Sequence, residues 1–167
     1  LTARLTRHFT MLWVPELAKE SMRTIFSSIL GGFLAAYEFS AEQVALAQPL
    51  VDATIECYAG IREAMLPTPS KSHYTFNLRD ISKVMQGMLQ MRTSKCADAD
   101  QLVRLWMHEA SRVFCDRLVD DDDRAWFDNK VAAIIKETEG LGGRDWDPKT
   151  FHGITFIAMT PKTIGLI

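Results

Sequence analysis

The sequence lacks the motifs that would let a chain of this length bind a nucleotide or a metal by itself. It contains no G-x-x-x-x-G-K-[ST] phosphate-binding loop and no apolar strand ending in an Asp–Glu pair, so we expect no nucleotide hydrolysis from this chain alone. Its only cysteines, Cys57, Cys96 and Cys115, are far apart and form no C-x-x-C pair. This spacing indicates neither a disulfide framework nor a zinc cluster, and it fits a reducing compartment.

The sequence also has little excess charge and no long hydrophobic run. Its formal net charge is −2, whereas nucleic-acid-binding domains carry a marked basic excess, so we expect no nucleic-acid partner. With 47% hydrophobic and 24% charged residues, the 167-residue chain has the composition of a globular domain rather than a membrane-spanning one, and we expect no membrane partner. Because it begins at Leu1 without an initiator Met or a secretory signal, we expect a segment of a longer protein.

Apolar residues recur three and four positions apart along most of the chain, which is the spacing of a helix face. The predicted helices are residues 18–36, a segment from Ser40 to Met65 that is kinked or restarts near Pro49, a helix capped by Asn77 that includes 81–89, residues 102–118, and a last helix that follows the acidic run 120–123. The sequence therefore predicts a mainly α fold.

Two segments depart from this helical pattern. Phe9–Val14 is short, apolar and partly aromatic and ends at Pro15, which predicts a buried strand that closes an α/β unit. After Glu139 the sequence becomes rich in Gly and Pro and contains one β-like run, Ile154–Met159. We predict one short strand before the helices and leave the tail unassigned.

Asn77 and Arg79 stand where the most regular apolar stripe begins, in the segment "KSHYTFNLRD". Asn77 is a good N-cap residue, and Asp80 three positions later is placed to complete a capping box. Arg79 then lies in the first turn, where unpaired N–H groups and the helix dipole already favour an anion. We interpret Arg79 as a sensor whose planar guanidinium grips a nucleotide phosphate, with Asn77 beside it. The alternative is an exposed residue of an amphipathic helix.

Arg4 and Arg7 precede the predicted strand, and two interpretations of them remain open. They are either solvated charges at a helix end or arginines at the edge of an α/β unit. In the second case one of them would reach the nucleotide of a neighbouring subunit and stabilise charge that develops in phosphoryl transfer.

Two motifs that could suggest a metal site fail on spacing. "HEASR" begins like a zinc-protease motif, but Arg112 occupies the place of the second histidine. "DDDDR", residues 120–124, has four consecutive carboxylates, which do not supply the alternating ligands of a calcium loop. We expect no metal site and interpret the acidic run as a helix start, where negative charge is favourable.

Three motifs together resemble the dynein heavy chain family: "RLTRHF", "LPTPSKSHYTFNLRDISKVMQGML" and "RLWMHEASRVFCDRLVDDDDRAWF". The resemblance covers about residues 4–127 and is greatest to axonemal heavy chains. It implies the helical bundle lid of the third AAA+ module, preceded by one short strand from the α/β large subdomain. The implied division is residues 1–15 as the end of the large subdomain, 16–127 as the lid, and 128–167 as a further helix and an atypical tail.

The same resemblance implies roles for the arginines and for the parent protein. Arg79 would be the second sensor of its own module, and Arg7, with Arg4 in reserve, would be an arginine finger acting on the preceding module. The implied cofactors are ATP or ADP with Mg in the parent, with none for this segment alone. The implied partners are the adjacent AAA+ modules and, through the rest of an ATP-hydrolysing motor, microtubules and the dynein intermediate and light chains. The implied location is cytoplasmic and cytoskeletal, in the axoneme of a cilium or flagellum.

A second hypothesis comes from the missing phosphate-binding loop and from the eight methionines. Under it, the chain is a non-catalytic helical protein-interaction module whose partner covers the surface around Met85 and Met88. Against it, methionines at helical spacing more often fill a core than line a groove.

Overall fold

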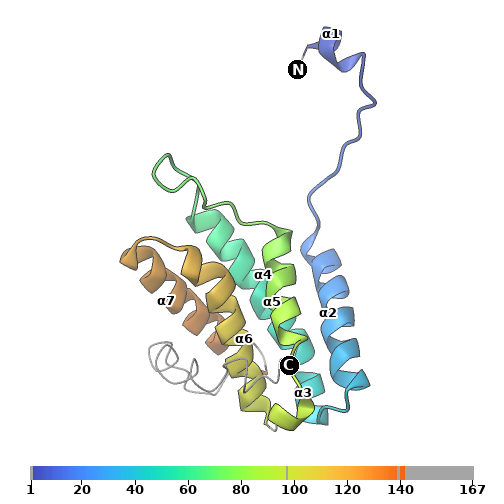
Figure 1. Cartoon of the computed structure of the whole chain (residues 1–167), viewed down its shortest axis with the longest axis vertical. Helices are drawn as coiled ribbons and strands as arrows, with labels where there is room; N and C mark the ends of the chain where they lie inside the picture. The colour runs from blue at the N-terminus through green and yellow to red at the C-terminus, as the bar shows by residue number, and fades with distance from the viewer. Residues whose placement is uncertain (1, 97, 139, 142–167) are drawn as a thin grey trace.

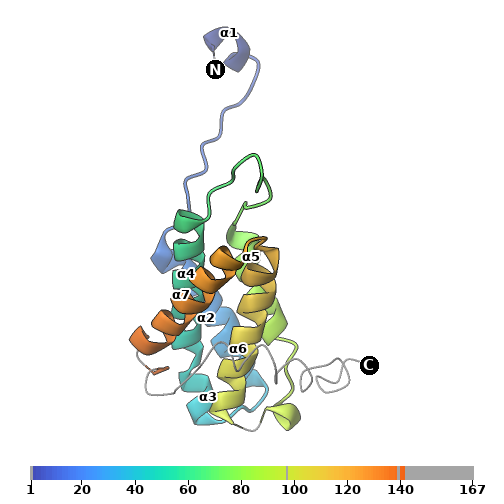
Figure 2. The same ribbon diagram turned by 90° about the vertical axis from the view of Figure 1, so that its left-hand side faces the viewer.

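The computed structural model describes residues 2–96, 98–138 and 140–141, and within them the chain is mainly helical, which confirms the predicted fold class (Figure 1). Its α-helices are α1 (Ala3–Thr6), α2 (Lys19–Ala36), α3 (Ala41–Ala45), α4 (Ala47–Ala64), α5 (Leu78–Met88), α6 (Ala99–Phe114) and α7 (Asp121–Glu137). Two short 3₁₀ helices, η1 (Thr93–Lys95) and η2 (Cys115–Arg117), stand before and after α6. Figures 1 and 2 show α1 apart from the bundle formed by the other helices.

Helices α2 and α4 pack side by side and run in opposite directions. Across their edge, Arg23 Nε donates to Asp52 Oδ1 at 2.6 Å, and Ser27 Oγ donates to Gln48 Oε1 at 2.7 Å. The residue number rises along α2 while it falls along α4, which is the order that an antiparallel pair requires.

The buried face of α2 is narrower than the sequence predicted. It consists of side chains four positions apart: Met22, Phe26, Leu30 and Leu34. Ile25 and Ile29, which also fit the predicted stripe, are 46% and 44% exposed. Helices α4 and α3 cover one side of α2, and the flank of the apolar stripe stays open to solvent.

The segment from Ser40 to Met65 forms two helices, as the position of Pro49 predicted. Ser40 begins α3 with a capping box, in which Gln43 N–H donates to Ser40 Oγ at 3.3 Å and Ser40 N–H donates to Gln43 Oε1 at 3.0 Å. The helix is interrupted at Leu46, which ends α3 and precedes α4, and Pro49 lies in the first turn of α4. Proline is tolerated there because the N–H that it lacks would have no partner within the helix.

Helices α5, α6 and α7 complete the core around α4 (Figure 2). Met85 and Met88 of α5 are 2% and 0% exposed, so the interpretation of these methionines as core residues is confirmed. Phe114 of α6 lies with its ring centroid 6.2 Å from that of Phe76 and 6.3 Å from that of Phe127 on α7. None of the described helices is long and apolar enough to cross a membrane.

The predicted strand at Phe9–Val14 is absent from the structure. This segment is extended, but it has no neighbouring strand in the described residues, and Leu12, Trp13 and Val14 are 85–87% exposed. A β-strand needs a partner for its backbone N–H and C=O groups, and the part of the chain that the structure describes offers none there. The other predicted β-like run, Ile154–Met159, lies outside the described residues.

All three cysteines are free and buried, and burial raises their thiol pKa values. The pKa rises from 9.0 to about 12 for Cys57 and to about 11 for Cys96 and Cys115. Because the thiolate is the reactive form, we expect iodoacetamide at pH 8 to modify native Cys57 roughly a thousandfold more slowly than a free thiol. Mass spectrometry over time would measure this rate.

Denaturation provides the control for the cysteine prediction. In urea, all three thiols should react at the rate of an exposed cysteine. The folded state binds the thiol protons more tightly than the unfolded state, so this contribution to stability is complete below pH 9 and is lost as the pH rises toward 11 or 12. Rapid labelling of Cys57 in the folded chain would contradict the prediction.

Candidate functional site

The N-terminal end of α5 is fixed by the capping box that the sequence predicted. Arg79 N–H donates to Asn77 Oδ1 at 2.9 Å, and Asn77 N–H donates to Asp80 Oδ2 at 2.9 Å. The structure therefore brings Asn77 and Arg79 together at one helix start. The side chain of Asp80 is only 4% exposed, so the cap is anchored on the buried side of the helix.

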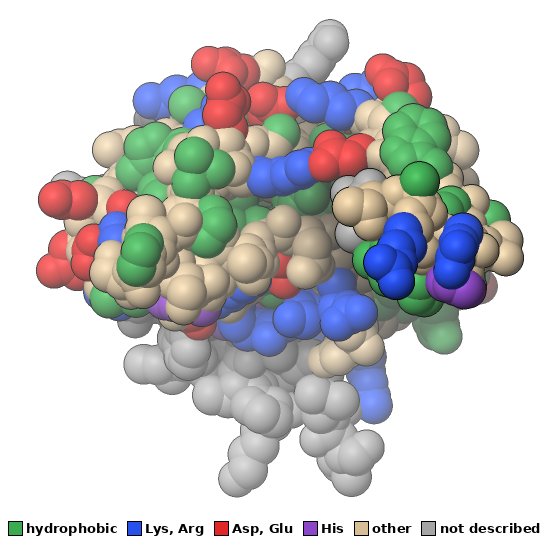
Figure 3. All heavy atoms as spheres, turned by 90° about the horizontal axis from the view of Figure 1, so that it is seen from above, with side chains coloured by type: hydrophobic (Ala, Val, Ile, Leu, Met, Phe, Trp, Pro, Cys, Tyr) green, Lys and Arg blue, Asp and Glu red, His purple; other side chains and the backbone are tan. Residues whose placement is uncertain are grey.

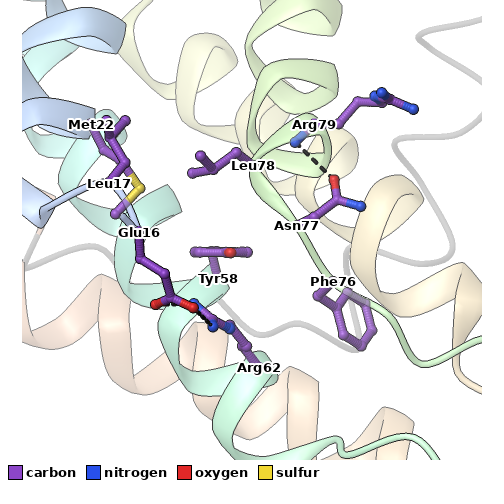
Figure 4. A pocket seen from close by; sticks show the side chains of 9 residues that line it. All are labelled: Glu16, Leu17, Met22, Tyr58, Arg62, Phe76, Asn77, Leu78 and Arg79. Carbon is purple, nitrogen blue, oxygen red and sulfur yellow. Dashed lines mark hydrogen bonds and ion pairs between the residues drawn. The ribbon is translucent and has the colours of Figure 1, made fainter. Parts of the chain in front are cut away.

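The side chain of Arg79 is exposed, and its guanidinium has no hydrogen bond or ion pair with the described residues. Figure 4 shows it pointing away from Tyr58 and Arg62. Its position on the first turn of α5 adds a cation to the positive end of the helix dipole. The site is therefore suited to an anion that approaches from outside this chain.

A pocket of about 580 Å³ opens beside this helix start, between the segment before α2, the second half of α4 and the beginning of α5. Its lining residues are Glu16, Leu17, Met22, Tyr58, Arg62, Phe76, Asn77, Leu78 and Arg79. Figure 4 shows Leu78 pointing from α5 toward Leu17 and Met22. The pocket thus combines apolar side chains with polar ones, and two arginines are among its lining residues.

Glu16 and Arg62 close one side of the pocket through a two-point ion pair. Arg62 Nη1 donates to Glu16 Oε2 at 3.2 Å, and Arg62 Nη2 donates to Glu16 Oε1. The hydrogen bond from Arg62 lowers the pKa of Glu16 from its ordinary value. Sequence analysis missed this pair because its members lie 46 residues apart and no local pattern relates them.

The loop between α4 and α5 is held against the start of α7. Lys71 Nζ pairs with both Asp120 and Asp123, and these hydrogen bonds raise the pKa of Lys71 while Lys71 lowers that of Asp123. Tyr74 Oη donates to Asp123 Oδ2 at 2.8 Å and accepts from Val119 N–H at 2.9 Å. The acidic run is therefore a helix start, as predicted, and it also secures this loop.

Arg4 and Arg7 are not brought near Arg79. Both are exposed on or directly after α1, and Figures 1 and 2 show α1 at the far end of the extended segment. Arg7 Nε donates to His8 Nε2 at 3.0 Å. Seen from the side of α1, the surface carries both acidic and basic side chains, and neither sign covers it (Figure 3).

Metal ligands do not gather in the part of the chain that the structure describes. No group of three or more His, Cys, Asp or Glu side chains there is arranged to hold a metal ion. His108 is half-buried beside Glu109, with 3.8 Å between Nε2 and Oε1, and His73 Nε2 lies 3.0 Å from the carbonyl oxygen of Arg117. At the start of α5, the exposed guanidinium of Arg79 is a group suited to bind an anion.

Comparison with known proteins identifies relatives of this bundle. Residues 25–124 match the family described as dynein heavy chain, ATPase lid domain. The chain is 50% identical over 148 residues to dynein axonemal heavy chain 1 of Mus musculus, which covers 82% of this chain and 4% of the relative. Identity is 48% over 149 residues to dynein axonemal heavy chain 1 of Homo sapiens (83% and 4%) and 42% over 137 residues to dynein axonemal heavy chain 12 of Homo sapiens (82% and 4%). The chain thus spans about 4% of the length of these relatives.

Proposed function

The chain belongs to the dynein heavy chain family and contains its ATPase lid domain, and from this premise we propose that it is the lid of the third AAA+ module in an axonemal heavy chain. In this proposal the lid senses the nucleotide of that module and relays its state around the motor ring during microtubule-based movement of a cilium or flagellum. The single observation that carries the proposal is the exposed guanidinium of Arg79, which has no ion pair within the described residues and stands at a fixed helix start.

The geometry supports a sensor in two ways. The capping box fixes the backbone of Arg79, while its side chain is free to follow an anion. The helices behind it share one close-packed core, so a pull on Arg79 would move the bundle as a unit. Phosphate gained or lost in a neighbouring pocket would in this way become a rotation of the lid.

The finger role belongs to Arg7, with Arg4 as the reserve. Both side chains are exposed, and α1, which contains Arg4 and ends at Arg7, stands apart from the bundle (Figure 1), which leaves them available to another module of the ring. In the parent, the cofactor would be ATP or ADP with Mg, and the phosphate-binding loop would come from sequence outside this chain. The adjacent modules would be direct partners, whereas microtubules and the intermediate and light chains would act through the rest of the motor. The boundaries at residues 15 and 127 remain predictions.

Arg79→Ala tests the sensor directly. In a motor ring that contains this lid and whose other nucleotide sites have been inactivated, we expect the variant to bind ADP about tenfold more weakly, because it loses one charge-assisted contact to phosphate. Titration with a fluorescent ADP analogue would measure the affinity.

Arg92→Ala is the matched control for this experiment. Arg92 is exposed beyond the opposite end of α5, so its loss changes the net charge equally without touching the helix start. Its affinity for ADP should equal that of the parent. Unchanged binding in Arg79→Ala, or an equal loss in both variants, would contradict the sensor role.

The alternative, a helical protein-interaction module, predicts a binding surface around Met85 and Met88, but the structure buries both side chains. A partner could reach them only if the bundle opened. The observed burial therefore favours the lid proposal over this form of the alternative.

A further inference from the structure

Arg117 connects the turn between α6 and α7 to the start of α5. Its Nη1 lies 3.1 Å from Asp80 Oδ1, and its Nη2 donates to the carbonyl oxygens of His73 at 3.1 Å and Thr75 at 3.0 Å. The guanidinium also lies 4.7 Å from the centroid of the Phe76 ring. One side chain thus contacts four residues in the eight positions that lead into and begin α5.

Asp80 is the link between Arg117 and the cap. Its Oδ1 faces Arg117, while its Oδ2 accepts the hydrogen bond from Asn77 N–H. The carboxylate is almost completely buried, where losing an ionic partner is costly. By holding Asp80, Arg117 therefore helps to fix the position of the Asn77 backbone N–H. Asn77 Oδ1 in turn accepts the hydrogen bond from Arg79 N–H, so the backbone of Arg79 is fixed as well.

Separate contacts attach the loop before α5 to Val119 and to the start of α7. Lys71 and Tyr74 of the loop bind Asp123 in the first turn of α7, and Val119 N–H donates to Tyr74 Oη. The chain into α5 is consequently attached at two places to the segment that begins α7. Movement of α5 relative to α7 would have to break one of these attachments.

We propose that Arg117 is a positioning residue that holds the start of α5, and with it Arg79, in a fixed orientation relative to α7. The inference deepens the proposed function and rests on it, because it connects Arg79 to α7 through the contacts of Arg117. Arginine suits the task because its planar fork serves a carboxylate and two carbonyl oxygens at once, whereas lysine offers a single ammonium group.

The first test measures the cap in the 167-residue chain without nucleotide. In Arg117→Gln, we expect the amides of Asn77 and Arg79 to exchange hydrogen about fivefold faster, because their capping bonds lose the support of Arg117. Arg117→Lys should restore part of the protection. Nuclear magnetic resonance would follow each amide, and thermal melting would verify that each variant is folded.

Arg124→Gln is the matched control. Arg124 lies near the start of α7, and Arg124→Gln removes the same charge, but its contacts are Leu118 O at 3.1 Å and Asp121 Oδ1 at 2.9 Å, not the α5 cap. Its cap amides should exchange as in the parent. Unchanged exchange in Arg117→Gln, or an equal rise in Arg124→Gln, would overturn the positioning role.

The second test uses the motor ring and a double-mutant cycle. Arg117→Gln should weaken ADP binding at the third site about threefold, and it should add nothing to the effect of Arg79→Ala, because it acts through that residue. Full additivity would overturn the inference. If the cap loosens but Arg79→Ala leaves binding unchanged, the sensor role of Arg79 fails while the hold of Arg117 on the α5 start stands.

Discussion

Replacement of Trp106 by Ala is expected to lower the free energy of unfolding by about 3–5 kcal/mol. Trp106 is the largest fully buried side chain of the described residues and joins α6 to α4. Its removal would leave a cavity between two helices that the rest of the bundle packs around. Because small domains are stable by only about 5–15 kcal/mol, this variant should unfold at a much lower urea concentration, as followed by circular dichroism.

Thr54→Val separates the hydrogen bond of Trp106 from its packing. Trp106 Nε1–H donates to Thr54 Oγ1 at 2.8 Å, and Thr54 Oγ1–H donates to Leu50 O at 2.7 Å, with both side chains fully buried. Valine keeps the shape but leaves the indole N–H unpaired, which should cost about 1–3 kcal/mol. Stability within about 0.5 kcal/mol of the parent would show that this bond contributes little.

Gly87→Ala should also destabilise the bundle, by about 1–3 kcal/mol, because the side chain of Glu109 on α6 occupies the space that a Cβ at this position of α5 needs. A Cβ at Gly87 would lie 2.0 Å from Glu109 Oε2 and 2.2 Å from its Cδ. Glu109 would have to move, although it is buried and accepts hydrogen bonds from Arg112 Nε at 3.0 Å and Nη2 at 2.6 Å. Urea denaturation of the two proteins would measure the difference.

Gly32→Ala is the matched control, because it makes the same change where there is room. A Cβ at Gly32, within α2, meets nothing within 4 Å, so the better helix propensity of Ala should raise stability by about 0.5–1 kcal/mol. In the Gly87→Ala background, Glu109→Ala should recover part of the loss by removing the obstructing carboxylate. Equal stabilisation by both glycine substitutions would contradict the obstruction of the Gly87 position by Glu109.

The helices and their caps could be predicted from the sequence because their causes are local. Ser40 with Gln43 and Asn77 with Asp80 each form a capping box across three residues, and Pro49 marks the restart of a helix within the same short segment. The strand predicted at Phe9–Val14 is not shown by the structure, for the opposite reason. Its composition favours a strand, but a strand is defined by hydrogen bonds to a neighbour, and the described chain provides none.

The features of the candidate site also differ in whether local sequence could predict them. The position of Arg79 on the first turn follows from its neighbours in the chain, and it was predicted. The Glu16–Arg62 pair and the hydrogen bonds of Arg117 to His73 and Thr75 join residues 42–46 positions apart, and no pattern within one helix signals them. Such pairs are set by how the helices pack. Membership in the family was recognised from long motifs, whereas the third-module placement and the sensor role remain proposals.

The exposed course of residues 7–15 has a thermodynamic consequence for the bundle. Every described side chain in this stretch is open to solvent, and the hydrophobic core begins only at Met22. Bending or straightening the stretch therefore leaves the core contacts intact and changes the folding free energy little. Residues 7–15 can therefore change direction without disturbing the packing of the helices that follow.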